Sequence, residues 1–140
     1  MSHLEDKLND TPIKNMGICG IFALHYITEL PLAKIYNDYK NNFCRGLKRW
    51  NGSTRHVYRL RLLDILGLNY KEIKLEKEFT LKTVMKMFQN HKTPIMIRVR
   101  GHVMVLDNNL IYDQSNISGI DINKCKHKNR RVTSATTLKE

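Results

Sequence analysis

Three apolar, β-rich runs follow one another in residues 94–113, PIMIRVRGHVMVLDNNLIYD. Runs of this length, rich in Ile and Val, are typical of strands. Each run predicts one strand, at residues 95–99, 102–106 and 109–113. Asp107 and Asn108 between the last two tolerate positive φ and suit the two-residue turn of a β-hairpin. This stretch therefore predicts an antiparallel sheet late in the chain.

The residues before this stretch predict helices. Apolar residues recur at the spacing of one helical face in four segments, at residues 19–30, 32–39, 53–66 and 80–88. Shorter strands are predicted at 70–75 and 131–138, and residues 115–129 are predicted to be irregular. Because helices come first and an antiparallel sheet follows, the fold class is α+β, with N-terminal helices packed on a small antiparallel sheet.

Polar and special residues mark the ends of these helices. Pro31 ends the first helix, and Thr80 can cap the fourth. Ser53 or Thr54 can cap the third, which Gly67 would stop. The third helix is predicted to bury Val57, Leu60, Leu63 and Leu66.

Length and composition fit a globular protein. The chain has 140 residues, of which 41% are hydrophobic, so we expect one domain over 1–140 with a polar lead-in at 1–14. No apolar run has the length of a membrane span, and residues 1–14 do not resemble a secretory signal, so we expect a cytoplasmic protein. The three cysteines are too widely spaced to suggest a disulfide framework.

Cys19 is the candidate nucleophile. It stands at the head of the first predicted helix, where unpaired N–H groups lower the pKa of a thiol. Gly17 and Gly20 on either side would leave room for a substrate backbone. The alternative is that Cys19 is a small residue of the core, since free cysteines are often buried.

His102 and Asp113 are the candidate partners of Cys19. With a turn at Asp107 and Asn108, His102 lies directly opposite Asp113 on the hairpin, where a carboxylate can hold an imidazole. With a turn one residue later, His102 would face Ser115, and we would expect the pairing to fail. We prefer the first register, which gives Cys19 a base in His102 and gives His102 an orienting carboxylate in Asp113.

Several short motifs in this order resemble the papain-like cysteine peptidase superfamily, and in particular small papain-like proteins of phages and bacteria. The matching pieces span roughly residues 15–138 and are Cys19-Gly20, Gly52-Ser53-Thr54, Leu66-Gly67, Arg100-Gly101-His102, Leu106-Asp107-Asn108, Tyr112-Asp113 and Arg130-Arg131-Val132. The resemblance implies a papain-like fold, a Cys19–His102–Asp113 triad and a phage product that acts in the host cytoplasm on a host or viral protein.

The chain departs from the family at the oxyanion donor. Papain-like enzymes usually carry a Gln several residues before the cysteine, and this chain has none there. Asn15 is the only side-chain amide nearby and is the candidate donor beside the Cys19 N–H, the alternative being a turn residue. Gln114, which follows the candidate acid, could line the cleft.

The net charge of +11, from 24 basic and 13 acidic residues, favours acidic partners. The first basic cluster, in which Trp50 and Tyr58 are interleaved, contains Arg45, Lys48, Arg49, Arg55, Arg59 and Arg61. The second contains Lys124, Lys126, Lys128, Arg130 and Arg131. Such clusters suit nucleic acid or an acidic protein, although a solvated surface explains them as well. The dense charge around Cys125 and His127 disfavours zinc, and we expect no metal and no cofactor.

These observations favour a thiol-dependent hydrolase that cleaves a peptide, isopeptide or related amide bond in a protein or peptide substrate. One alternative is a catalytically weak papain-like module that binds and inhibits a host protein or nucleic acid through its basic surface. A second alternative is an acyltransferase that uses the same three residues. The sequence indicates no membrane partner.

Overall fold

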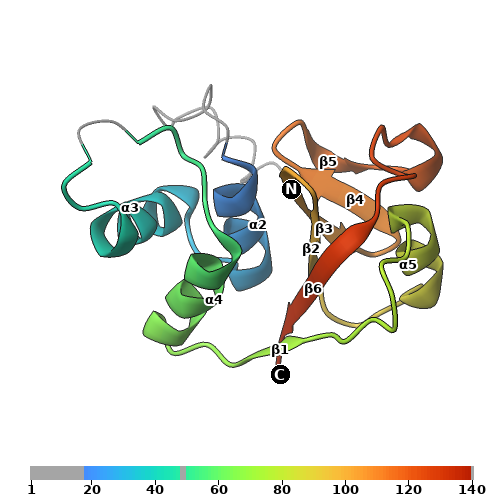
Figure 1. Ribbon diagram of the computed structural model, residues 1–140, viewed down its shortest axis with the longest axis horizontal. Helices are drawn as coiled ribbons and strands as arrows, with labels where there is room; N and C mark the ends of the chain where they lie inside the picture. Colours follow the sequence, from blue (N-terminus) through green and yellow to red (C-terminus); the bar gives the residue numbers. More distant parts are fainter. Residues whose placement is uncertain (1–17, 48–49, 140) are drawn as a thin grey trace.

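The computed structural model describes residues 18–47 and 50–139. A helical part lies beside a sheet that carries a further helix on its far side (Figure 1). In chain order the elements are α2 (Cys19–Thr28), α3 (Leu32–Phe43), α4 (His56–Ile65), β1 (Tyr70–Glu72), α5 (Leu81–Met87), β2 (Ile95–Val99), β3 (His102–Asp107), β4 (Leu110–Asp113), β5 (Asn116–Ile120), the 3-10 helix η1 (Ile122–Lys124) and β6 (Val132–Leu138). These elements confirm the α+β class.

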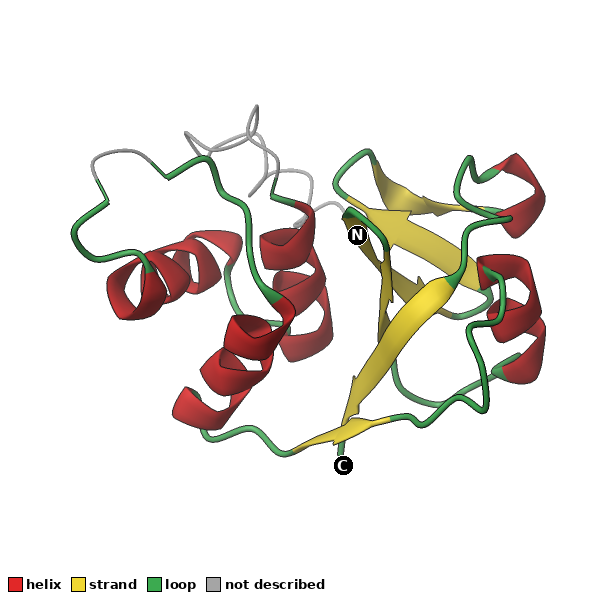
Figure 2. Cartoon of the chain, viewed as in Figure 1, coloured by secondary structure: helices red, strands yellow, loops and turns green. Residues whose placement is uncertain are grey.

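The six described strands form one sheet in the order β1-β6-β2-β3-β4-β5, and every pairing is antiparallel (Figure 2). Alternation along β3 divides the core in two. Val103 and Val105 pack with α2, whereas Met104 and Leu106 pack with α5. The sheet is therefore buried on both faces, and the predicted packing of N-terminal helices on the sheet is confirmed for α2.

Helix α2 lies between the sheet and the two outer helices α3 and α4 (Figure 1). Its residues from Gly20 to Ile27 are all buried, and not only the single face that the apolar spacing predicts. The Tyr26 hydroxyl donates to Asp107 Oδ2 at 2.6 Å and ties the helix to the end of β3. No helix in the described ranges combines the length and apolarity needed to cross a membrane.

Helix α4 differs from its prediction at its start and in its buried face. It begins at His56, and neither Ser53 nor Thr54 caps it, because Arg55 occupies the N-cap position. Val57 is 61% exposed, whereas Arg59 is only 2% exposed. The helix presents residues 59, 60, 62 and 63 to the core. The predictions of Gly67 as the stop (φ of 73°) and of Thr80 as the cap of α5 are confirmed.

The predicted register of the β3–β4 hairpin is wrong. The turn is formed by Asn108 and Asn109, whose φ angles are 51° and 64°, and Leu106 pairs with Ile111. Continuing this register places Asp113 diagonal to His102 and not opposite it. Moving the turn by one residue shifts the pairing by two, so every side chain stays on its face of the sheet. Diagonal neighbours remain within reach of each other, which preserves the pairing that we expected to lose.

Residues 115–129 were predicted to be irregular, but they contain β5 and η1. The strand β5 lies at the edge of the sheet, and its residues are half-buried or exposed, so it lacks a strong apolar signal. Gly119 has a φ of 91°, and a β-carbon there would lie 2.9 Å from the Tyr112 ring. The other boundaries differ by a few residues, as in β1, which ends at Glu72.

Candidate active site

Cys19 is the first residue of α2, and it is half-buried. The residue before it is held from the sheet side, because the Ile18 N–H donates to Gln114 Oε1 at 3.0 Å. The first N–H groups of a helix have no partner within the helix, and they favour a negative charge nearby. The thiol therefore lies where a thiolate is stabilised.

His102 is the first residue of β3, directly after Gly101, whose φ of 78° lets the chain turn sharply from β2. The ring hydrogen-bonds to both other candidate residues, the Cys19 thiol and the Asp113 carboxylate. His102 Nε2 lies 2.9 Å from Asp113 Oδ2, so Nδ1 is the nitrogen left for the thiol. The ring is thus placed between a nucleophile and an acid.

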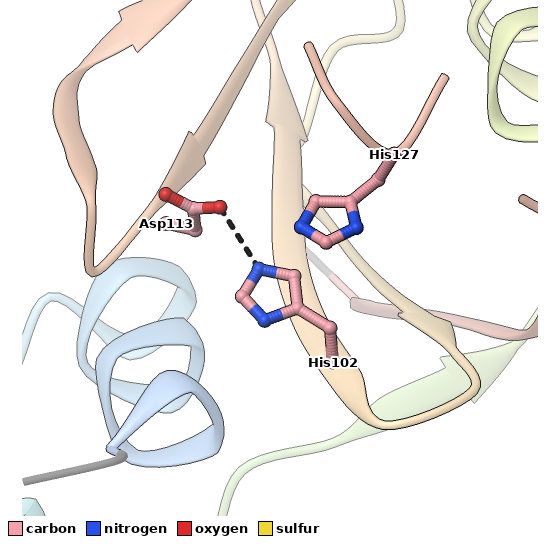
Figure 3. Close-up of side chains that lie close together, drawn as sticks. All are labelled: His102, Asp113 and His127. Carbon is pink, nitrogen blue, oxygen red and sulfur yellow. Dashed lines mark hydrogen bonds and ion pairs between the residues drawn. The ribbon is translucent and has the colours of Figure 1, made fainter. Parts of the chain in front are cut away.

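Asp113 is the last residue of β4 and is only 3% exposed. Figure 3 shows its carboxylate directed at the His102 ring. The other oxygen, Oδ1, accepts from the Ser115 N–H and from Asn116 Nδ2, both at 3.0 Å. Because both oxygens are engaged, the carboxylate has a fixed orientation.

The three groups shift one another's pKa values. Burial raises the pKa of the Cys19 thiol, but the hydrogen bond to His102 leads the contributions that outweigh it, so this pKa is lowered. Burial alone would lower the pKa of His102, but the hydrogen bonds to Asp113 and Cys19 raise it to about 9. Burial also opposes the lowered pKa of Asp113, which its hydrogen bonds to His102 and Asn116 produce. These directions favour a thiolate beside an imidazolium at neutral pH.

The other two cysteines behave differently. Cys44 and Cys125 are 7% and 4% exposed, and burial raises the pKa of each thiol. Of the three thiols, Cys19 is the one whose surroundings favour the reactive thiolate.

His127 is a residue of this site that the sequence interpretation missed. Its ring stacks on the His102 ring with centroids 4.4 Å apart and an interplanar angle of 20° (Figure 3). It is 8% exposed, and burial and then the charge of His102 lower its pKa, so the ring is neutral. It covers one side of the His102 ring. Its place in a basic loop gave no signal of this role.

The same side chains form the grouping best suited to a metal ion within the described ranges. His102, Asp113 and His127 each offer a ligand atom, and these atoms lie within 4.8 Å of one another. A metal ion there would compete with the hydrogen bond between His102 and Asp113. The charges of Arg130 and Lys126 also lower the pKa of His127, so they oppose an added cation. Cys125 does not belong to the grouping.

A cleft of about 400 Å³ opens beside Cys19 and His102. Its lining consists of Cys19, Ser53, Thr54, Arg59, Arg98, Gly101, His102, Val103, Gln114 and Ser115. Gln114 therefore lines the cleft, as expected. Gly17 lies outside the described residues.

The sequence predicted that Gly20 would leave room for a substrate backbone, and this prediction is wrong. A β-carbon at position 20 would lie 1.9 Å from Thr54 Oγ1 and 3.3 Å from Arg59 Cδ. The missing side chain lets the segment before α4 approach α2. Gly20 thus shapes the wall of the cleft.

Arg59 belongs to this wall and not to a basic surface. It is 2% exposed, and its Nη1 donates to Thr54 Oγ1 at 2.7 Å. Its Nε is buried without a hydrogen-bond partner. A contact between α4 and the start of α2 buries Arg59, and helical spacing within α4 alone could not reveal that contact.

Two predicted features fall partly or wholly outside the described residues. The oxyanion candidate Asn15 lies outside them, as do Lys48 and Arg49 of the basic surface. Of the remaining basic-surface residues, Arg45 and Arg55 are exposed as expected. Within the described ranges, the Cys19 N–H at the helix start and the guanidinium of Arg59 are candidate donors to an oxyanion, and the backbone of Val103 hydrogen-bonds to the thiol itself.

The aromatic residues of the first basic cluster stack on the chain itself. Trp50 stacks on Tyr39 with centroids 5.2 Å apart, and Tyr58 stacks on Phe43 at 4.8 Å. Both rings therefore already have an aromatic partner, which weakens the case for a base-stacking platform.

Comparison of the chain with protein-family models, with curated proteins and with solved structures finds no match.

Proposed function

We propose that this protein is a thiol-dependent hydrolase of amide bonds with a papain-like arrangement of its active site. The observation that carries the proposal is the continuous hydrogen-bonded chain from the Cys19 thiol through the His102 ring to the Asp113 carboxylate. A nucleophile at a helix start, facing a histidine and an acid on neighbouring strands, is the arrangement that the family resemblance implies. A protein or peptide is the proposed substrate.

The contacts suggest a reaction in two halves. The Cys19 thiolate attacks the carbonyl carbon, and the negative oxygen that forms is stabilised by the Cys19 N–H. His102 gives its Nδ1 proton to the leaving nitrogen as the C–N bond breaks, which leaves an acyl thioester on Cys19. His102 then takes a proton from water, and the hydroxide attacks the thioester. The acid product leaves, and the Cys19 thiolate is regenerated. Asp113 holds the ring and stabilises its charged form.

The pH dependence of alkylation tests the first half. Cys19 should react with iodoacetamide well below the ordinary thiol pKa of about 8.5, and the profile should change again near pH 9, where His102 loses its proton. Peptide mass spectrometry resolves Cys19 from the buried Cys44 and Cys125, which report on unfolding. The reference is the same peptide in the unfolded chain. Equal rates in the folded and unfolded chains across the pH range would overturn the proposal.

An activated ester tests the second half. p-Nitrophenyl acetate should acetylate Cys19 and then be turned over, and Cys19→Ser should lose both steps. Adding a primary amine separates the two enzymatic candidates, because an acyltransferase would pass the acetyl group to the amine in preference to water.

The basic surface supports a second candidate function, which is binding without catalysis. Arg45 and Arg55 are exposed, and the chain carries a net charge of +11. If binding to an acidic partner is the function, Cys19→Ala should leave it intact, whereas Arg45→Glu with Arg55→Glu should abolish it. An affinity for nucleic acid would fall steeply with added salt.

A further inference from the structure

Arg59 is a buried cation without an acidic partner in the part of the chain that the structure describes. It is 2% exposed, and the ion pairs of the described residues join Lys34 to Asp38, His56 to Glu72 and His102 to Asp113. Its neutral contact with Thr54 Oγ1 leaves Nε buried and unbonded. The charge of a Cys19 thiolate acts on Arg59, but the guanidinium has no hydrogen-bonded anion among the described residues. Burying a guanidinium without such a partner is unfavourable, so a bound anion is expected to complete the site.

The surroundings of Arg59 extend this deficit of negative charge to the whole cleft. A second arginine, the exposed Arg98, lines the same cleft, and none of the described residues in its lining is an Asp or Glu. Burial, and then the charge of Arg98, lower the pKa of Arg59 to about 10, which still leaves it protonated at neutral pH. The hydroxyl groups of Ser53 and Ser115 are further donors in the same lining. The cleft is thus rich in donors and positive charge.

The fold holds Arg59 in this position by a close contact. Thr54 fills the space that a side chain at Gly20 would occupy, and its hydroxyl accepts from Arg59 Nη1. Arg59 also lies near enough to Cys19 for its charge to contribute to the lowered pKa of the thiol. A group bound by Arg59 would therefore lie beside the reacting atom.

We propose that the cleft binds an oxyanion, a carboxylate or a phosphate, through Arg59 and Arg98, and that the substrate carries this anion next to the bond that Cys19 attacks. A guanidinium offers a planar fork of donors that matches either group. The substrate class rests on the proposed hydrolase function. The anion site can be tested without that function.

Two alkylating reagents of similar size provide the test. Iodoacetate is an anion and iodoacetamide is neutral, so the ratio of their rates at Cys19 measures anion recognition beside the thiol. Relative to the same ratio in the unfolded chain, we expect a preference for iodoacetate on the order of tenfold at low ionic strength. The charge of His102 would also attract iodoacetate, so the arginine variants decide the assignment.

Arg98→Gln and Arg59→Lys should each reduce the preference, the first by removing charge and the second by removing the fork of donors. Arg45→Gln is the matched control, because it removes an exposed charge outside the cleft and should change the ratio by less than about twofold. A preference that is equal in wild type, Arg98→Gln and Arg59→Lys would overturn the proposal and leave Arg59 as a counter-ion of the thiolate.

Competition identifies the anion and covers an unreactive thiol. Inorganic phosphate and acetate are each titrated as protectants of Cys19 against iodoacetamide. The stronger protectant shows whether the site prefers a phosphate or a carboxylate. The same anions are titrated by calorimetry with Cys19→Ser, which needs no reactive thiol. Rapid iodoacetamide reaction without anion binding would overturn this inference alone. Anion binding that Arg59→Lys weakens, with an inert Cys19, would support it while the hydrolase proposal fails.

Discussion

Arg98, Arg59 and His102 are the cationic side chains that line the cleft beside Cys19. Arg98 is exposed, whereas His102 and Arg59 are withdrawn from solvent and differ in what balances their charge. His102 has a carboxylate at 2.9 Å, and Asp113 in turn has a partner for each of its oxygens. Arg59 is buried more deeply, yet its described side-chain partner is a neutral hydroxyl. His102 therefore has the partners that a proton-transfer group needs within the protein. Arg59, in contrast, keeps hydrogen-bond donors that a bound ligand could use.

The largest effect is expected from removing His102, the cation that has a carboxylate partner. His102→Ala should lower any esterase turnover by about 10²–10⁴-fold, and it should lower the rate of Cys19 alkylation near neutral pH by about tenfold or more. The reason is that the thiol loses both the hydrogen bond and the charge that lower its pKa. The measurement is the iodoacetamide rate at pH 7 for both proteins. His91→Ala, a change at a histidine outside the cleft, serves as control, and a similar loss there would contradict the assignment.

The next largest effect is expected from removing only the carboxylate charge of Asp113. Asp113→Asn should return the pKa of His102 from about 9 towards its ordinary value, which NMR titration of the ring would measure. The raised pKa stabilises the fold fully below about pH 6.5, and this contribution is lost as pH rises through about 9. The variant should therefore be less stable by about 1.5–3 kcal/mol at pH 6. A destabilisation that does not shrink towards pH 9 would contradict this account.

Disturbing the position of the unsupported cation comes third. Gly20→Ala places a β-carbon where Thr54 Oγ1 lies, so it should cost about 1–3 kcal/mol of unfolding free energy and weaken the preference for iodoacetate. Denaturant titration and the alkylation ratio measure the two effects. Thr54→Ala added to Gly20→Ala should recover part of the stability but not the preference. Full stability in Gly20→Ala would show that Thr54 can move aside easily.

The smallest expected effect concerns the ring that covers His102. His127→Phe keeps an aromatic ring and should retain most of the reactivity of Cys19. His127→Ala should lose the stacking, which for aromatic pairs is worth about 0.5–1.5 kcal/mol. Unfolding free energy and the alkylation rate separate the two variants. Lower reactivity in His127→Phe than in His127→Ala would indicate that a nitrogen of His127 takes part.

The candidate triad could be predicted because its signals are local. Apolar spacing placed Cys19 at a helix start, and strand alternation kept His102 and Asp113 on one face even though the turn was assigned one residue early. Arg59 and His127 could not be predicted in the same way. One is buried by a contact with Gly20 on another helix, and the other reaches the site from a loop beyond η1.

The pair Asp113-Gln114 joins the two halves of the site mechanically. Asp113 restrains His102, and the next residue restrains the chain at Ile18, immediately before Cys19. One peptide unit thus tethers both reacting groups, so a displacement at the end of β4 would carry the thiol and the ring along together. The distance between the Cys19 thiol and the His102 ring, which governs proton transfer, should therefore change little when the helices and the sheet move relative to each other.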